Sequence, residues 1–489
     1  MSIKRLLFLL LSFSFILIIG CTTKEAAKVE KVQEPPVSRD YNKSFPSDSQ
    51  DYGLGNLCSG EEECKEFCLN NRGRCEEYCR NNPENEFCRI LFPFGVASDE
   101  DNSEREESYS EYNYFDDVSH LPSCGDKKEF FTTLPIALEG FTTIDPLGLL
   151  SPTAHTFPAP HLYFRIKREG DSFEGPVVKV PLYAPADITI TKINLIHATN
   201  SLEFADDAAV HFAPCSEFKA YFDHVVDLAP KLQTAYDSAS VDRCDEYTLT
   251  YKSGPVNWKK CDKNVNLKVS EGELIGYAGG GQGQAVLDLG AFDSRIEPNK
   301  YASTTRVFRT ELPYNVCPLD YFSSSVSALY RPRLGGYGYS QSSNVLITSP
   351  TCGKVIQDIP NTAKGNWFAP GIDTTRFGHE PPHLALVQGH IDQDIQAFSN
   401  GDSTKNSGLD FGIYYFTPQN SGLVNRDFAQ VKSDGNVYCY NTKSNYKKDE
   451  PTTIIIQLTN PETLKIEGLG TTGCGSGPWS FNNPTEFER

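Results

Sequence analysis

Six cysteines near the N-terminus have a residue type and a spacing that could do chemistry: Cys58, Cys64, Cys68, Cys75, Cys79 and Cys88. A thiol can form a disulfide bond or bind zinc as a thiolate. Two of the pairs are spaced four residues apart, which places each pair on one face of a helix. About 30 residues cannot sustain a fold through a hydrophobic core alone. We therefore expect a disulfide-stapled helical hairpin over residues 57–90. A zinc module is the competing interpretation, and the segment contains no histidine to complete one.

A second candidate lies far down the chain, where His379 and His383 enclose Glu380. The spacing superficially fits the His-Glu-x-x-His motif of zinc proteases, which needs a helix to place both histidines on one face. Pro381 and Pro382 forbid that helix, so we expect a loop without a metal. The sequence shows no Ser-His-Asp set, phosphate-binding glycine loop or nucleotide fingerprint that stands out.

The composition limits the partners and the compartment. A length of 489 residues allows about three domains at roughly 150 residues each. The net charge of −19 argues against nucleic acid, because binding phosphates needs a basic surface. Fifteen cysteines are too many for a reducing compartment unless they bind metal, so we expect an oxidising exterior.

The N-terminus supports an extracytoplasmic location. Lys4 and Arg5 precede an apolar run from Leu6 to Ile19, which is too short for a typical membrane span of about 20 residues. The run ends in Gly20-Cys21, which resembles a lipoprotein lipobox. We therefore expect a signal peptide over residues 1–20 and a lipid anchor at Cys21, on the outer face of the cell membrane. An uncleaved anchor helix and a secretory signal cut elsewhere are the alternatives.

The remaining elements are predicted from local composition. Residues 21–56 are polar and contain Pro35-Pro36, so a flexible tether is expected. Residues 91–122 are strongly acidic, which favours a solvated linker over a calcium site. From about Ser123 onward, short alternating runs separated by Gly, Pro, Asn and Asp predict a mainly β chain. We divide it into one β domain over residues 123–298 and a second over residues 299–489, with Asp223–Tyr236 as the best candidate for a short helix.

Eight further cysteines lie in this β region and in the segment entering it: Cys124, Cys215, Cys244, Cys261, Cys317, Cys352, Cys439 and Cys474. The even number fits bridges within the domains, although their connectivity cannot be read from the sequence. Cys244 with Cys261 is the first expectation, because the two flank one insertion.

Residues 265–293 predict a compact β-meander. Val265, Leu267 and Val269 alternate with polar residues, Glu271-Gly272 is a turn signal, and two more short strands follow. This stretch resembles the end of the lysostaphin-type zinc endopeptidases, which cut peptidoglycan cross-bridges. Three earlier segments match further landmarks of that family in the same order: His161–Arg165, Pro181–Asp187 and Ala220–His224. The resemblance covers residues 153–293, under a third of the chain, and implies a lysostaphin-like β-sheet or barrel.

The resemblance also implies functional positions. His161 stands at the first zinc-ligand position, Arg165 at the second and Asp288 at the third, while His224 and Val286 stand at the two catalytic positions. Arg165 cannot ligate zinc, because its guanidinium is always positively charged. Val286 cannot transfer a proton. A catalytic zinc needs three protein ligands and an open position for water, and only His161 and Asp288 remain of the family set.

We expect that Arg165 fills the position of the metal and pairs with Asp288. A surface pair is the plainer alternative. A shifted metal site stays open, because other potential ligands lie nearby in the sequence: His155, His197, His211, Asp187 and Asp223.

These observations predict a lipid-anchored cell-envelope protein, without a cofactor, whose peptidase-like domain binds an envelope peptide or glycan rather than cutting it. The first alternative is an active zinc endopeptidase with substituted ligands. The second is a glycan-binding or adhesion protein that acts through its C-terminal domain. That domain contains aromatic residues able to stack on sugars, although β domains of this size bury many aromatics anyway: Tyr337, Tyr339, Trp367, Tyr414, Tyr415 and Trp479.

Overall fold

The computed structural model describes most of the chain from residue 114 onward: 114–171, 175–201, 204–251, 254–280, 284–303, 306, 309, 311–339, 344–347, 351–372, 380–447 and 449–489. These residues belong to one compact unit, Tyr109–Arg489. The signal peptide, Cys21, the tether, the six-cysteine hairpin, most of the acidic linker and His379 lie outside the described residues, and their predictions remain predictions. No helix in the described ranges is both long and apolar enough to cross a bilayer.

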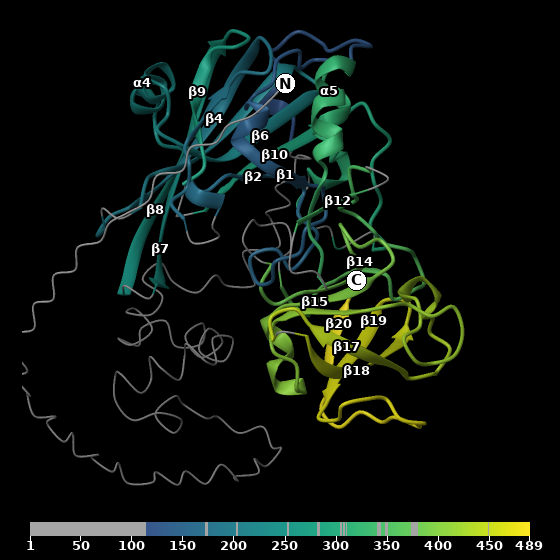
Figure 1. Ribbon diagram of the computed structural model, residues 1–489. Helices are drawn as coiled ribbons and strands as arrows, with labels where there is room; N and C mark the ends of the chain where they lie inside the picture. The colour runs from purple at the N-terminus through teal and green to yellow at the C-terminus, as the bar shows by residue number, and fades with distance from the viewer. Residues whose placement is uncertain are drawn as a thin grey trace, which may run out of the picture. The chain divides into compact units, whose positions relative to one another are not determined.

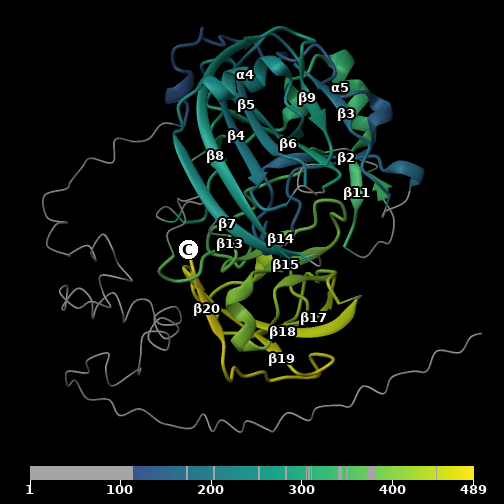
Figure 2. The ribbon, with the colours of Figure 1, turned by 90° about the vertical axis from the view of Figure 1, so that its left-hand side faces the viewer.

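The first β-sheet has ten antiparallel strands (Figures 1 and 2). They are paired in the order β1-β2-β10-β6-β5-β4-β8-β7, and β9 pairs with both β3 and β6. Strands from distant parts of the sequence therefore become neighbours, with β10 between β2 and β6. The strands are β1 (Phe141–Asp145), β2 (His161–Ile166), β3 (Val180–Tyr183), β4 (Ile188–Ala198), β5 (Asp207–Cys215), β6 (Phe218–Val226), β7 (Arg243–Tyr251), β8 (Gly254–Val269), β9 (Leu274–Ala278) and β10 (Val286–Asp293).

The predicted mainly β fold is confirmed, and the strands predicted within residues 265–293 are the end of β8 together with β9 and β10. Their predicted arrangement as a meander is wrong, because β8 pairs with β4 and β7, β9 with β3 and β6, and β10 with β2 and β6. The helix expected from Asp223 is wrong in its first half. Residues up to Val226 continue strand β6, and helix α4 (Pro230–Ser238) starts at the proline. Proline suits the first turn of a helix because its missing N–H would have no partner there. Leu232 and Tyr236, four residues apart, bury one face of α4.

The second β-sheet has eight antiparallel strands paired in sequence order (Figure 1). They are β13 (Gly365–Trp367), β14 (Leu384–Gln388), β15 (Gln396–Asn400), β16 (Gly412–Phe416), β17 (Tyr438–Ser444), β18 (Glu450–Asn460), β19 (Thr463–Leu469) and β20 (Thr485–Glu488). Phe368, directly after β13, exchanges two backbone hydrogen bonds with Glu488 in β20, of 2.8 and 2.9 Å, which closes the sheet into a barrel. Its interior is filled by side chains such as Trp367, Phe398 and Tyr440, as is usual for barrels of this size.

The segment that links the sheets contains α5 (Ser324–Tyr330), β11 (Gly335–Tyr337) and β12 (Asn344–Leu346). Tyr330 packs its ring against Phe141 and Phe164 of the first sheet, with centroids 5.8 and 5.3 Å away. The boundary predicted between residues 298 and 299 therefore does not separate two hydrophobic cores. Short 3-10 helices complete the described structure: Asp116–Val118, Leu138–Gly140, Glu169–Asp171, Leu312–Tyr314, Pro318–Tyr321, Arg331–Arg333, Asp402–Ser407 and Phe428–Gln430.

The packed part of the chain begins before residue 123. Phe115 and Val118 are buried in the core of the first sheet. Lys219 of β6 donates to the carboxylate of Asp117 over 2.8 Å. Residues 114–122, predicted as the end of the acidic linker, thus contact the sheet directly.

Four disulfide bonds use all eight cysteines of the β region. Cys244 and Cys261 face each other across β7 and β8, so the first expected pairing is confirmed. The other bonds are Cys124–Cys215, Cys317–Cys352 and Cys439–Cys474.

Candidate functional site

The register between β2 and β10 gathers the candidate residues on one face of the first sheet. Asp288 lies opposite Tyr163, Gly290 opposite His161, and Val286 opposite Arg165. Side chains two residues apart on a strand point to the same face. The sequence positions singled out in β2 and β10 therefore share one surface.

The centre of this face is the carboxylate of Asp288, which is 2% exposed. Its Oδ2 atom lies 3.2 Å from Nε2 of His161 and 3.7 Å from Nε2 of His224. The structure thus brings His161, His224 and Asp288 together, although β2, β6 and β10 are far apart in the sequence. We call these three residues the central triad.

A β-bulge directs the side chain of His224 toward Asp288. Val210 pairs with Phe222, but Ala208 pairs with Val225, so β6 contains one more residue than β5 over this stretch. His224 occupies the bulge with a φ of 63°, a conformation that is uncommon for a residue other than glycine. Bulges re-aim side chains in this way.

His224 has an acidic partner that the sequence analysis missed. Its Nδ1 atom lies 2.9 Å from Oδ2 of Asp207, a buried residue at the start of β5. The backbone N–H of His224 donates to Oδ1 of Asp223 over 2.9 Å. The sequence analysis names Asp223 as a possible oxygen ligand. It does not name Asp207, because in the sequence an aspartate that follows Asp206 at the start of a strand has the pattern of a solvated turn residue.

Burial and the neighbouring charges shift the pKa values of the two histidines of the central triad in opposite directions. Burial opposes a charge on His224, but Asp207 and Asp288 outweigh it and raise the pKa of His224 to about 10. Burial raises the pKa of Asp288 to about 7. Burial, together with His155 and His224, lowers the pKa of His161 well below 6.5. The site therefore pairs a charged His224 with a neutral His161 at neutral pH.

Tyr221 fixes the ring of His161. Its hydroxyl lies 2.7 Å from Nδ1 of His161. The Tyr221 ring reaches this position across Gly290, where a Cβ atom would lie 2.2 Å from the ring. A glycine at this position of β10 is therefore required for the contact between Tyr221 and His161.

Arg165 has a different partner from the one expected. Its guanidinium binds Oδ2 of Asp145, with an Nε–Oδ2 distance of 2.8 Å and a second contact through Nη2. The expected pairing of Arg165 with Asp288 is wrong, because Asp145 at the end of β1 lies next to β2 and points to the same face. Burial raises the pKa of Asp145, and Arg165 counteracts that shift.

The residues that the sequence resemblance assigns to metal positions do not fit a catalytic zinc. Arg165 brings a positive charge that is already neutralised by Asp145. Among the described residues, three possible ligand atoms lie within 4.8 Å of one another at two places, and neither includes His161 or Asp288. One place is Asp207, Asp223 and His224. The other is Cys124, Cys215 and Glu217, where both sulfurs are in a disulfide bond.

The remaining histidines differ in their relation to the triad. The ring of His155 lies 5.3 Å from that of His161, and its Nδ1 atom lies 3.8 Å from Oε1 of Glu380. Glu380 also accepts a hydrogen bond from the backbone of Phe157, so the Glu-Pro-Pro loop lies beside the site and forms no helix in its described part. His197 pairs with exposed Asp206 instead. The ring of His211 lies 5.5 Å from that of Tyr221.

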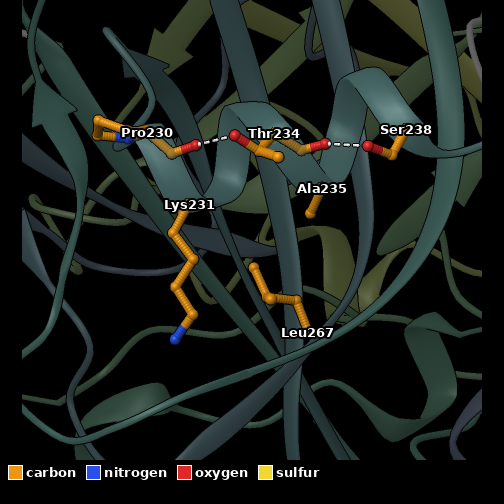
Figure 3. A pocket seen from close by; sticks show the side chains of 6 residues that line it. All are labelled: Pro230, Lys231, Thr234, Ala235, Ser238 and Leu267. Carbon is orange, nitrogen blue, oxygen red and sulfur yellow. Dashed lines mark hydrogen bonds between the residues drawn. The ribbon is translucent and has the colours of Figure 1, made fainter.

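Two hollows on the described surface lie away from the triad. One of about 460 Å³ borders α4 and is lined by Pro230, Lys231, Thr234, Ala235, Ser238 and Leu267 (Figure 3). Its hydroxyls donate to helix carbonyls, and Lys231 pairs with Glu273, so the polar groups around it are already satisfied. The other borders the Cys124–Cys215 bond. Neither is lined by a residue of the central triad.

Comparison with known proteins identifies no relative: no family model, no curated protein and no solved structure matches this chain.

Buried His390, whose Nδ1 atom lies 3.4 Å from the hydroxyl of Tyr339, should make the fold sensitive to acid. Burial, with a smaller effect of Arg165, lowers the pKa of His390 to about 3. As the pH falls from 6.5 toward 3, the unfolded chain binds a proton that the folded chain does not, so stability falls. In His390→Gln we expect the slope of unfolding free energy against pH to drop by up to about 1.4 kcal/mol per pH unit. Urea unfolding of both chains at several pH values measures the slope, and an equal slope in the two would contradict the prediction.

Proposed function

We propose that this chain is a lipid-anchored cell-envelope protein whose peptidase-like sheet binds an envelope peptide or glycan without cutting it. The observation that carries the proposal is the ion pair between Arg165 and Asp145. By the sequence resemblance, Arg165 stands where a lysostaphin-type enzyme would need its second zinc ligand, and the ion pair with Asp145 neutralises its guanidinium. Without that ligand, the family's way of activating water is lost.

The state of Asp288 supports the same proposal. Its carboxylate lies between the imidazoles of His161 and His224, and His224 is further engaged by Asp207. The groups that would bind a metal and a water molecule in an enzyme are thus in contact with one another.

The location is supported by features at both ends of the chain. Gly20-Cys21 matches a lipobox after an apolar run. Four disulfide bonds within residues 124–474 suit an oxidising compartment. The net charge of −19 suits a soluble domain outside the membrane rather than a nucleic-acid partner.

A second candidate, glycan binding by the barrel, is favoured by one specific observation. Phe411 and Tyr446 are 52% and 48% exposed, and their ring centroids lie 6.1 Å apart. Such a pair can stack on a sugar. Most of the aromatic residues first considered for this role belong to the core instead, including Trp367, Tyr414 and Tyr415.

The test is zinc content and hydrolysis in the full-length chain, purified in detergent from an oxidising compartment. We expect substoichiometric zinc that does not depend on His161, and no cleavage of purified peptidoglycan. The chain should nevertheless co-sediment with envelope material. Stoichiometric zinc and cleavage, both lost in His161→Ala but kept in exposed His120→Ala, would establish the enzyme instead. Zinc that persists in His161→Ala would point to the cysteine module.

Co-sedimentation also separates the two binding candidates. Loss of binding in a Phe411→Ser, Tyr446→Ser variant would assign the ligand to the barrel. Unchanged binding in that variant is the result expected for the peptidase-like sheet.

A further inference from the structure

We propose that the disulfide bond between Cys244 and Cys261 is a redox-sensitive latch, which holds strand β7 on β8 and releases it when a dithiol reduces the bond. The proposal does not rest on the proposed function, since it uses no residue of the central triad. The two cysteines lie directly opposite each other in the pairing of β7 with β8. β7 is the last strand in the order of the first sheet and pairs with β8 alone among the described strands (Figure 1).

This bond is the most accessible of the four bonds in the β region. Cys244 is exposed and Cys261 is half-buried. The cysteines of the other three bonds are buried or half-buried: Cys124 is 7% exposed, Cys215 5%, Cys317 9%, Cys439 0% and Cys474 7%, and Cys352 is half-buried. A thiolate breaks a disulfide by attacking one of its sulfurs, so access to a sulfur decides which bond reacts first. We therefore expect the bond between Cys244 and Cys261 to be reduced before the others.

The side chains of β7 hold the strand in place only weakly. All those that the structure describes, in residues 243–248, are exposed, so they add little hydrophobic stabilisation. Glu246 pairs with Lys259 of β8 over 3.2 Å, but the two side chains are 71% and 41% exposed, and exposed ion pairs contribute little to stability. Thr248 adds a hydrogen bond of 2.9 Å to the side chain of Asn257. Besides the backbone ladder, the disulfide is therefore the strongest link between β7 and β8.

The reaction is a thiol–disulfide exchange with a dithiol. One thiolate of the dithiol attacks Sγ of Cys244, forms a mixed disulfide with it and displaces Sγ of Cys261 as a thiolate. The second thiolate of the dithiol then attacks the dithiol's own sulfur in the mixed disulfide and displaces Sγ of Cys244. Two electrons thus pass from the dithiol to the chain, and the dithiol becomes a disulfide. The protons released from its two thiols neutralise the two cysteine thiolates.

Release of β7 changes the edge of the first sheet. β8 also pairs with β4, so β8 stays in the sheet and becomes its edge strand. The backbone groups of residues 254–262 that pair with β7 in the latched chain then become available to another extended segment. Buried Trp258, which lies opposite Tyr247, loses its neighbour on this side. Reduction thereby exposes an edge that can accept a strand.

Graded reduction tests the access to the bond. We would treat the full-length chain, purified in detergent, with increasing concentrations of dithiothreitol and block the free thiols with N-ethylmaleimide. Peptide mass spectrometry then reads each modified cysteine separately. Cys244 and Cys261 should be modified at a dithiothreitol concentration at least about tenfold below that needed for any other bond of the β region. Modification of another of these bonds at the same or a lower concentration would overturn the proposal.

Hydrogen exchange tests the release of the strand. In a Cys244→Ser, Cys261→Ser variant we expect the amides of β7 to exchange at least about tenfold faster than in the unmodified chain, with β5 and β6 unchanged. A Cys439→Ser, Cys474→Ser variant loses a bond of the barrel and is the matched control, in which the exchange of β7 should not change. Unchanged exchange in β7 of the first variant would show that the backbone ladder alone holds the strand. Faster exchange across the whole first sheet would show that the bond supports the fold rather than one strand. Either result would overturn the latch.

Discussion

Replacing Cys124 and Cys215 together by alanine should lower the free energy of unfolding by about 4.5 kcal/mol. The bond joins residues separated by 91 positions. Cross-linking such distant residues removes much of the conformational entropy of the unfolded chain, and the effect grows with loop length. The bond also fixes the segment before β1 to the end of β5, where Glu217 accepts hydrogen bonds from the backbone of Cys124 and the hydroxyl of Ser123.

The matched control is the Cys244–Cys261 bond, which spans 17 positions. Its removal should cost about 3 kcal/mol by the same relation. Urea unfolding of both double-alanine variants, followed by fluorescence under non-reducing conditions, measures the difference of about 1.5 kcal/mol. Equal losses, or a larger loss for Cys244–Cys261, would show that native contacts rather than loop length govern the stability of this sheet.

Arg165→Met should destabilise the fold by about 3 to 5 kcal/mol. The side chain of Asp145 is fully buried, and Arg165, 30% exposed, supplies its opposite charge. Removing one member of a buried ion pair leaves the other as an uncompensated charge in an apolar environment. The remaining carboxyl group must then protonate or draw water into the sheet.

A second substitution separates this effect from the loss of packing. Asp145→Asn combined with Arg165→Met removes the charge as well, and it should recover a large part of the lost stability. The exposed pair of Lys179 and Asp227 provides a control, since Lys179→Met should change stability by less than about 1 kcal/mol. If the double variant is no more stable than Arg165→Met in urea unfolding, the destabilisation does not come from the charge of Asp145.

The fold could be predicted from the sequence where its cause is local. The alternation in Val265–Val269 predicts the end of one strand, and the turn at Glu271-Gly272 predicts the start of the next. Both features depend on a few neighbouring residues, and the structure has both strands. The closing of the second sheet could not be predicted, because Phe368 and Glu488 meet only after the intervening strands have paired. The helix α5 was missed for a different reason: its seven residues are too short to show a helical period.

Some residues of the candidate site could likewise be predicted from the sequence, and others could not. The resemblance indicated His161, His224 and Asp288 by their order in the chain. In the structure, both histidines lie beside the carboxylate of Asp288. Asp145 and Asp207 were missed, since an acidic residue at the end of a strand is usually a solvated turn residue. The sequence also carries no signal for the bulge at His224, because the extra residue is defined only by pairing with β5.

The closed barrel has a consequence for the association of one chain with another. A β-strand with unpaired backbone groups is a template onto which a neighbouring chain can add its own strand. The two hydrogen bonds between Phe368 and Glu488 join the two edges of the second sheet and pair the backbone groups of these two residues. The first sheet still ends in β7, the last strand of its order. That strand carries exposed Arg243, Asp245 and Glu246, and such charges discourage edge-to-edge aggregation.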